Sequence, residues 1–168
     1  TVIVPIGGGG LIGGIGTALA EVAPEVRVVG VQAADAATVP QSLDKGMPVS
    51  IDDPDTIADG IATGHISDLT LSLIERHVDE VVTVTDGEIA RAILSLLERA
   101  RQRVEGAGAA SVAALLSDDL DVSGETVVPV LCGGNIDPPR LQEVLDHAMT
   151  DRVQLLRLRV RIEDQPGN

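Results

Sequence analysis

The sequence predicts an α/β fold in which a largely parallel sheet is covered by helices on both faces. Short apolar segments with strand character alternate with longer segments of helical periodicity. The strand segments are apolar throughout, as in sheets buried between two helix layers. Glycine-rich turns follow two of them, after Ile6 and after Cys132, and the ligands of such sheets lie at the carboxyl ends of the strands.

The first half of the chain is expected to contain two strands and three helices. The predicted strands are residues 2–6 and 26–33, and the predicted helices are residues 11–22, 34–43 and 68–77. Gly46 stops the second helix, and Ser67 provides an N-cap for the third. Between them, "MPVSIDDPD" is an acidic loop and "TIADGIAT" is a short extended or turn segment.

The second half continues the alternation. The expected elements are a strand at residues 80–85, a helix from Thr85, a small-residue helix in "EGAGAASVAALLSD", a strand at residues 126–132, and a helix that begins with Pro138 after an Asp137 cap. Thr85 and Glu88 form a capping box. The helix after them should bury one face, made of Ile89, Ile93, Leu96, Leu97 and Ala100.

The composition is strongly acidic and free of aromatic residues. Asp and Glu number 26 against 12 basic residues, which gives a net charge of −14, and Lys45 is the only lysine. Such a field repels nucleic-acid phosphates and anionic lipids, so neither nucleic acid nor a membrane is an expected partner. We interpret the acidic surface as an adaptation to high salt, where screening removes the self-repulsion. No apolar segment reaches membrane-spanning length, and we expect a cytoplasmic location.

The four consecutive glycines Gly7–Gly10 are the strongest chemical signal. Successive backbone N–H groups can point inward there without a Cβ, and the following helix adds its positive amino end. This pattern predicts a phosphate cradle. The alternative is a tight strand–helix crossing that needs small residues only.

The same residues satisfy G-x-G-x-x-G through Gly8, Gly10 and Gly13, which suggests a dinucleotide-binding domain. Such a domain should carry an acidic residue at the end of the next strand. Gln32 stands there, with Asp35 close behind. A phosphate on a smaller cofactor fits these residues better.

Cys132 is the other candidate, as a weak hydrogen-bond partner, a nucleophile or a small core residue. No His or Arg lies beside it in the sequence to stabilise a thiolate, so a nucleophile is the poorest of these interpretations. The three histidines share no metal-ligand spacing, and the "DDPD" loop is interpreted as solvated rather than as a calcium site.

Five segments resemble, in order and spacing, the carboxyl-terminal half of the threonine and serine dehydratases. They are "VPIGGGGLIGGIGTA", "TIADGIAT", "VDEVVTVTDGEIARAI", "EGAGAASVAALL" and "VLCGGNID". These dehydratases are fold-type II enzymes that depend on pyridoxal 5′-phosphate (PLP). The resemblance implies part of the large domain of a fold like that of the tryptophan synthase β subunit, over residues 1–149.

The resemblance also implies roles for individual residues. Backbone N–H groups of Gly7, Gly8, Gly9, Gly10 and Leu11 would hold the cofactor's 5′-phosphate, and Cys132 would face the pyridine nitrogen as a neutral partner. Gly60 and Glu105 would line the cofactor ring, and Asn135 would shape the pocket. For Glu105, an ordinary helix cap is an equally good interpretation.

Two features depart from the family pattern. The lysine that forms the Schiff base, and the loop that binds the substrate carboxylate, have no counterpart here, and Lys45 lies in a different context. We therefore expect a fragment of a longer enzyme and no catalytic residue within this chain. Some relatives hold a divalent cation with a Glu at the position of Gln32 and an Asp near Thr38; without them, no Mg²⁺ or Mn²⁺ site is expected.

Residues 150–168 differ in pattern from the rest. "QLLRLRVRI" alternates apolar residues with arginines, as a half-buried strand does, and "EDQPGN" forms a turn. This segment resembles the first strand and turn of an ACT regulatory domain, which is an α+β fold. We expect a domain boundary near Thr150.

Together these observations predict a threonine ammonia-lyase that converts L-threonine to 2-oxobutanoate and ammonia, with serine as a second substrate, and that forms a homo-oligomer. The alternatives are a dinucleotide-binding oxidoreductase domain and a non-catalytic module that binds a phosphate ligand. The sequence leaves open the allosteric effector and whether the enzyme is biosynthetic or degradative.

Overall fold

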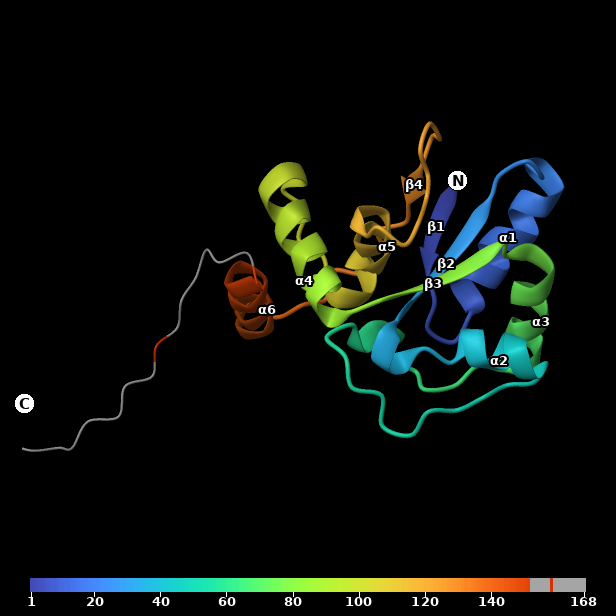
Figure 1. Cartoon of the computed structure of the whole chain (residues 1–168), viewed down its shortest axis with the longest axis horizontal. Coiled ribbons are helices and arrows are strands. Elements are labelled where there is room, and N and C mark those ends of the chain that lie inside the picture. Colours follow the sequence, from blue (N-terminus) through green and yellow to red (C-terminus); the bar gives the residue numbers. More distant parts are fainter. Residues whose placement is uncertain (152–157, 159–168) are drawn as a thin grey trace, which may run out of the picture.

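A parallel four-stranded sheet organises the computed structural model, which describes residues 1–151 and residue 158 (Figure 1). The strand order is β3-β2-β1-β4, and all three pairings are parallel. The strands are β1 Val2–Pro5, β2 Val28–Ala33, β3 Glu80–Val84 and β4 Val128–Pro129. The predicted α/β class with a parallel sheet is confirmed. The proposed ACT segment lies outside the described residues.

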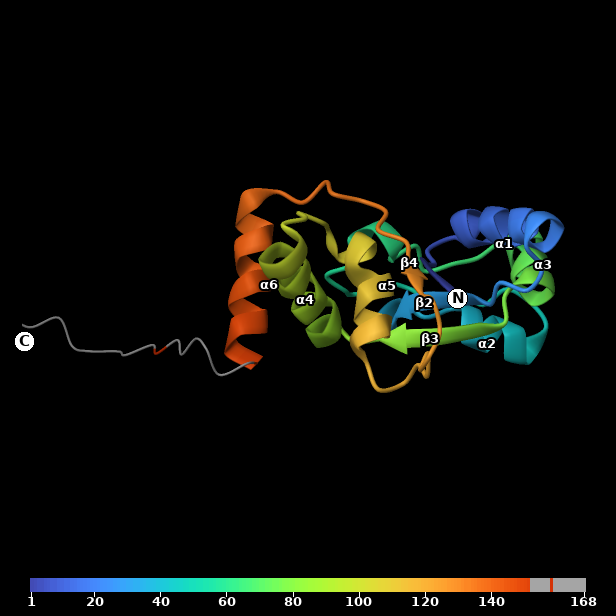
Figure 2. The same cartoon turned by 90° about the horizontal axis from the view of Figure 1, so that it is seen from above.

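Helices cover both faces of the sheet, in one layer on one face and in successive layers on the other. One face carries α1 Gly10–Val22, α2 Val39–Lys45 and α3 Asp68–His77. The other face carries α5 Gly106–Leu116, and beyond it lie α4 Asp86–Ser95 and then α6 Pro138–Asp151, as Figure 2 shows. None of the helices in this described part of the chain is long and apolar enough to span a membrane.

Two hydrophobic cores follow from the alternation of side chains along the strands. In β1, Ile3 faces the α4–α5 side and Val4 faces the α1–α3 side, and both are fully buried. Gly30 in β2 permits close packing on the second side, because a Cβ there would lie 2.4 Å from Ile6 Cδ1 and 3.0 Å from Ile12 Cδ1. Ile6, which directly follows β1, and Ile12 of α1 therefore fill the space above Gly30.

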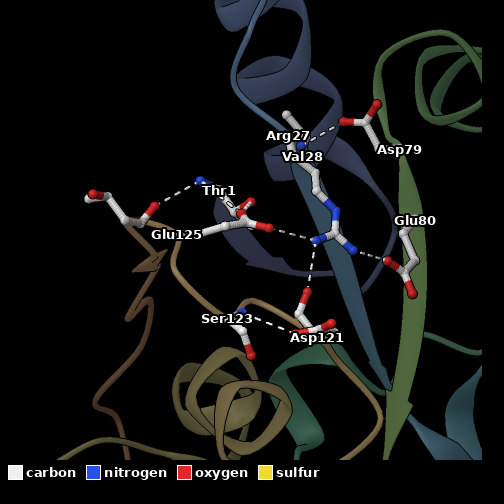
Figure 3. A network of polar contacts seen from close by, with 9 residues as sticks. Thr1, Arg27, Val28, Asp79, Glu80, Asp121, Ser123 and Glu125 are labelled. Carbon is white, nitrogen blue, oxygen red and sulfur yellow. Dashed lines mark hydrogen bonds and ion pairs between the residues drawn. The ribbon is translucent and has the colours of Figure 1, made fainter.

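The amino ends of the strands are joined by a polar network (Figure 3). Arg27 donates to Glu80 at 2.5 Å and to Glu125 at 3.3 Å, and the Asp79 carboxylate accepts the Val28 N–H at 2.7 Å. The network connects the starts of β2 and β3 with the segment before β4. The network lies at the amino ends of the strands, and the glycine turns lie at the opposite, carboxyl ends.

Local signals in the sequence set most helix boundaries correctly. Ser67 accepts the Thr70 N–H, and Thr85 accepts the Glu88 N–H, so both α3 and α4 begin with a capping box. Asp137 accepts the Arg140 N–H at 2.8 Å at the start of α6.

Three predicted elements differ from the structure. The helix expected at residues 34–43 is two pieces, a 3₁₀ turn Ala34–Ala36 and the helix α2 Val39–Lys45. Pro40 is the reason, because proline is compatible with the first turn of a helix and not with its interior. Gly46 ends α2 in the left-handed conformation, as predicted.

The strand expected at residues 126–132 is only Val128–Pro129, because proline has no N–H for a sheet ladder and is confined to edge strands. Cys132 therefore lies in the turn after β4.

In α4, Ile89, Ile93 and Leu96 are buried as predicted, whereas Leu97 and Ala100 are exposed. Residues Leu96–Ala100 form a π-helical turn, which rotates the face that the 3.6-residue period predicts.

Candidate active site

A cavity of about 220 Å³ lies at the carboxyl edge of the sheet. Its lining comes from four separate segments: Pro5 and Gly7–Leu11, Gly60–Ile61, Glu105 and Ala107, and Cys132. Both glycine turns thus meet at one place, as the strand pattern predicts. A larger groove of about 570 Å³ runs along α6, lined by Gln142, Asp146 and Thr150 among others, and it includes no residue of either turn.

Within the tetraglycine, Gly7 and Gly9 are required by the fold. A Cβ at Gly7 would lie 3.2 Å from both Ile61 Cα and Thr63 Cγ2. Gly9 has φ +87°, and a Cβ there would lie 2.9 Å from the Cβ of Thr70 in α3. These two glycines allow the turn after β1 to pass close to the residues 60–63 segment and to α3.

Gly8 and Gly10 have no such packing reason. A Cβ on either residue would meet no protein atom within 4 Å, and both residues are exposed and line the cavity. Neither has the positive φ that favours glycine. A side chain at either position would occupy space that the fold itself leaves open, which is the arrangement expected where a ligand approaches the backbone.

The amino end of α1 gives that space its chemistry. The N-cap residue Gly9 makes no side-chain capping bond, and the first turn of α1 contains no acidic residue. The first N–H groups of a helix have no partner within it, and they carry the positive end of the helix dipole. The open space at Gly8 and Gly10 and the uncapped helix end together fit a phosphate-bearing group.

Cys132 supplies a neutral polar atom to the cavity. Its thiol is half-buried, and burial, together with the negative charge of Glu105, raises its pKa. A raised pKa means that the thiol stays protonated at neutral pH. The side chain is therefore a weak donor or acceptor and a poor nucleophile, which agrees with the sequence interpretation.

Glu105 occupies the N-cap position of α5, but its side chain makes no capping bond. Instead its Oε2 accepts the backbone N–H of Asn135 at 2.8 Å, and its own N–H donates to the Gly133 carbonyl at 3.3 Å. A Cβ at Gly60 would lie 3.1 Å from Glu105 Oε1. The carboxylate thus contacts both the Gly60 turn and the Gly133–Asn135 turn.

Asn135 does not line the main cavity. It lines a cavity of about 50 Å³, together with Asp59, Asp137 and Arg140. The structure therefore brings eight of the nine sequence-predicted residues to one cavity, and it connects Asn135 to that cavity through its backbone bond to Glu105.

Three lining residues escaped the sequence analysis, namely Pro5, Ile61 and Ala107. They are ordinary apolar residues, and their type carries no chemical signal. Their position in the sequence does carry a signal, because each lies within two residues of a residue that the motifs single out.

The surroundings of Gln32 and Thr38 do not provide the ligands of a divalent-cation site. Gln32 is fully buried, its Oε1 accepts the Val39 N–H at 2.8 Å, and its Nε2 donates to the Ile6 carbonyl at 3.5 Å. The buried Thr38 hydroxyl has no hydrogen-bond partner. This set offers no carboxylate, and Mg²⁺ prefers at least one. Over residues 1–151 and residue 158, no group of three His, Cys, Asp or Glu side chains is arranged to hold a metal ion.

Comparisons of the sequence and of the fold with known proteins agree with one another. The sequence profile of a family described as "pyridoxal-phosphate dependent enzyme" matches residues 1–133. The chain is 47% identical over 167 residues to an L-threonine ammonia-lyase of Geobacter sulfurreducens and 42% identical over 166 residues to one of Thermotoga maritima. Each match covers 99% of this chain and 41% of the relative.

Among solved structures, threonine deaminase isoform 2 of Solanum lycopersicum, in its processed form, superposes with a TM-score of 0.78 at 30% identity. The superposition covers 88% of this chain and 43% of that protein. The chain therefore spans less than half the length of these relatives.

Proposed function

The chain belongs to the family of pyridoxal-phosphate dependent enzymes, and from that premise we propose that it is the carboxyl-terminal part of a threonine ammonia-lyase. The protein would convert L-threonine to 2-oxobutanoate and ammonia and would accept serine as a second substrate. The observation that carries the proposal is the open space at Gly8 and Gly10, beside an uncapped helix end and opposite a neutral Cys132 thiol.

When bound, PLP supplies an electron-withdrawing ring that stabilises negative charge at the substrate carbon attached to the amino group. The backbone N–H groups at Gly8 and Gly10 would hold its phosphate and so fix its orientation. Cys132, whose raised pKa keeps the thiol neutral, would face the ring nitrogen and leave it without a negative partner. Gly60 and Glu105, which line the same cavity, would form the wall beside the ring.

The reaction also needs an amine within covalent reach of the cofactor aldehyde. The only lysine, Lys45, is in the last turn of α2 and does not line the cavity. We propose that the required lysine and the substrate-carboxylate loop lie in a part of the protein outside these 168 residues. The share of the relatives that the chain covers, 41%, supports this arrangement.

Three further parts of the proposal rest on the sequence. Residues 150–168 begin an ACT regulatory domain, which the alternation of apolar residues and arginines supports. The protein is a cytoplasmic homo-oligomer. Its substrate is a small amino acid, which the names of the threonine ammonia-lyase relatives support.

The test measures PLP binding and the release of 2-oxobutanoate from L-threonine by the full-length protein, together with the visible absorbance of the bound cofactor. Gly8→Asp places a carboxylate in the phosphate position, and we expect at least about a hundredfold loss of PLP affinity from steric and charge conflict. Gly14→Asp is the matched control, because Gly14 is an exposed glycine of α1 with equally open surroundings, away from the cavity. Equal effects of both substitutions would refute the phosphate site.

The same measurements separate the alternatives. A non-catalytic module would bind PLP and release no 2-oxobutanoate. A dinucleotide-binding domain would bind a nicotinamide or flavin dinucleotide in preference to PLP. The structure gives that alternative little support, because Gln32, at the position of the ribose-binding acid, uses both ends of its amide on the backbone.

A further inference from the structure

Two turns that are distant in the sequence from Glu105 meet at its side chain, the Gly60 turn and the Gly133–Asn135 turn. Its carboxylate accepts the Asn135 N–H at 2.8 Å across a separation of 30 residues, and its backbone N–H donates to Gly133 at 3.3 Å. Gly60, in the other turn, also lies close to the carboxylate. Glu105 is therefore bonded twice to the turn that follows Cys132, once through its side chain and once through its backbone.

Two glycines leave the space that this carboxylate fills. A Cβ at Gly133 would lie 2.2 Å from Glu105 Oε1 and 2.7 Å from its Cδ, and Gly133 has φ +118°. A Cβ at Gly60 would lie 3.1 Å from the same oxygen. Any side chain at Gly133 would displace the carboxylate, so this glycine and Glu105 depend on each other.

Glu105 also lines two cavities. It lines the main cavity with Gly8, Gly10 and Cys132, and it lines the small cavity that contains Asn135 and Arg140. A carboxylate at this position can influence Cys132 in two ways. It can hold the backbone of the turn, and it can oppose a negative charge on the neighbouring sulfur.

We propose that Glu105 is a positioning residue. Its carboxylate fixes the Gly133–Asn135 turn, which directly follows Cys132, and thereby places the Cys132 thiol against the cofactor ring. The placement of the thiol in the cavity belongs to this chain alone, whereas its role against the ring rests on the proposed function. An ordinary cap of α5 does not account for the geometry, because the Glu105 side chain bonds to Asn135 and not to the first turn of α5.

The first experiment measures hydrogen exchange at the Asn135 amide in the full-length protein. Glu105→Ala removes the acceptor, and the amide should exchange at least about tenfold faster, as expected when a bond to a charged acceptor is lost. Glu105→Gln keeps an oxygen acceptor of the same reach, and we expect protection to stay within about threefold of the parent. Unchanged protection in Glu105→Ala would overturn the proposal.

The second experiment follows the pH dependence of Cys132 alkylation, read on the Cys132 peptide by mass spectrometry. Glu105→Gln removes a negative charge beside the sulfur without removing the acceptor, so the alkylation midpoint should move to lower pH. Glu75→Gln removes the same charge at an exposed position on α3 and should leave the midpoint unchanged. A midpoint that does not move in Glu105→Gln would contradict the effect of the Glu105 charge on the thiol, and with it the placement of the thiol beside the carboxylate.

A third measurement tests the mutual dependence of Glu105 and Gly133. Gly133→Ala should destabilise the protein strongly when Glu105 is present, and less when the carboxylate has been removed by Glu105→Ala. Additive effects would contradict the proposal. Hydrogen exchange and alkylation need no cofactor, so a failure of PLP to bind would refute the proposed function and leave these results standing.

Discussion

Gly9 in the turn after β1 lies directly against Thr70 in the first turn of α3, because a Cβ at Gly9 would come within 2.9 Å of the Thr70 Cβ. The contact continues along both helices, since Gly13 lies against Leu73 and Gly16 against His77. Gly9, Gly13 and Gly16 therefore serve the packing of α1 against α3, whereas Gly8 and Gly10 have no packing neighbour and line the cavity. The structure thus assigns the packing interpretation of the tetraglycine to Gly9 and leaves Gly8 and Gly10 open for the proposed phosphate.

This division predicts opposite phenotypes for neighbouring substitutions. Gly9→Ala should destabilise the protein by about 1–3 kcal/mol, because it adds both a steric conflict and left-handed backbone strain. Gly8→Ala should change stability by less than about 0.5 kcal/mol, because it meets no protein atom, and it should weaken PLP binding. Urea denaturation and cofactor titration provide the two measurements. A destabilised Gly8→Ala with unchanged PLP affinity would reverse the assignment.

Cys132 should show unusually low reactivity toward alkylating reagents. Burial and the charge of Glu105 raise its pKa, so the midpoint of alkylation in the folded protein should lie above that of an unfolded thiol, about 8.5. The group's contribution to stability is fully present below the unfolded pKa and is lost as pH rises through the folded pKa. The measurement compares alkylation rates with and without denaturant between neutral and alkaline pH; coincident midpoints would contradict it.

Gln32 should stabilise the protein by joining the end of β1 to the start of α2. Gln32→Leu leaves the Val39 N–H and the Ile6 carbonyl without their buried partner, at a cost of about 2–4 kcal/mol. Chelators should change neither the melting temperature nor PLP binding, because the site is built from an amide. Thermal unfolding with and without EDTA checks both statements. A large effect of the chelator would contradict the prediction that Gln32 binds no metal ion.

The acidic composition predicts stabilisation by salt. With a net charge of −14, repulsion between exposed carboxylates should fall as KCl is added, and the melting temperature should rise by several degrees or more. A titration from low to molar KCl measures this, with sucrose at matched osmolality as a control for general solute effects. A flat response to KCl would remove the salt-adaptation interpretation.

The features that local rules govern could be predicted from the sequence. Ser67, Thr85 and Asp137 begin their helices as expected, because a cap involves only residues three positions apart. The meeting of the two glycine turns also followed from the sequence, since parallel strands place their carboxyl ends at one edge.

The features that escaped prediction depend on residues distant in the sequence. Gly8 and Gly9 look alike in the sequence, and only the position of Thr70 distinguishes them. The bond from Asn135 to Glu105 likewise exists because two turns meet in space. The π-helical turn at Leu96–Ala100 exposes Leu97, and the regular helical period used for prediction has no means to represent it.

The position of Cys132 has a practical consequence. It is the only thiol in these 168 residues, it borders the cavity, and the chain has no Phe, Tyr or Trp to absorb or fluoresce. A ligand that fills the cavity should shield this sulfur from reagents. Protection of a single natural cysteine can therefore serve as an occupancy assay, with no introduced label and almost no optical background from this part of the protein.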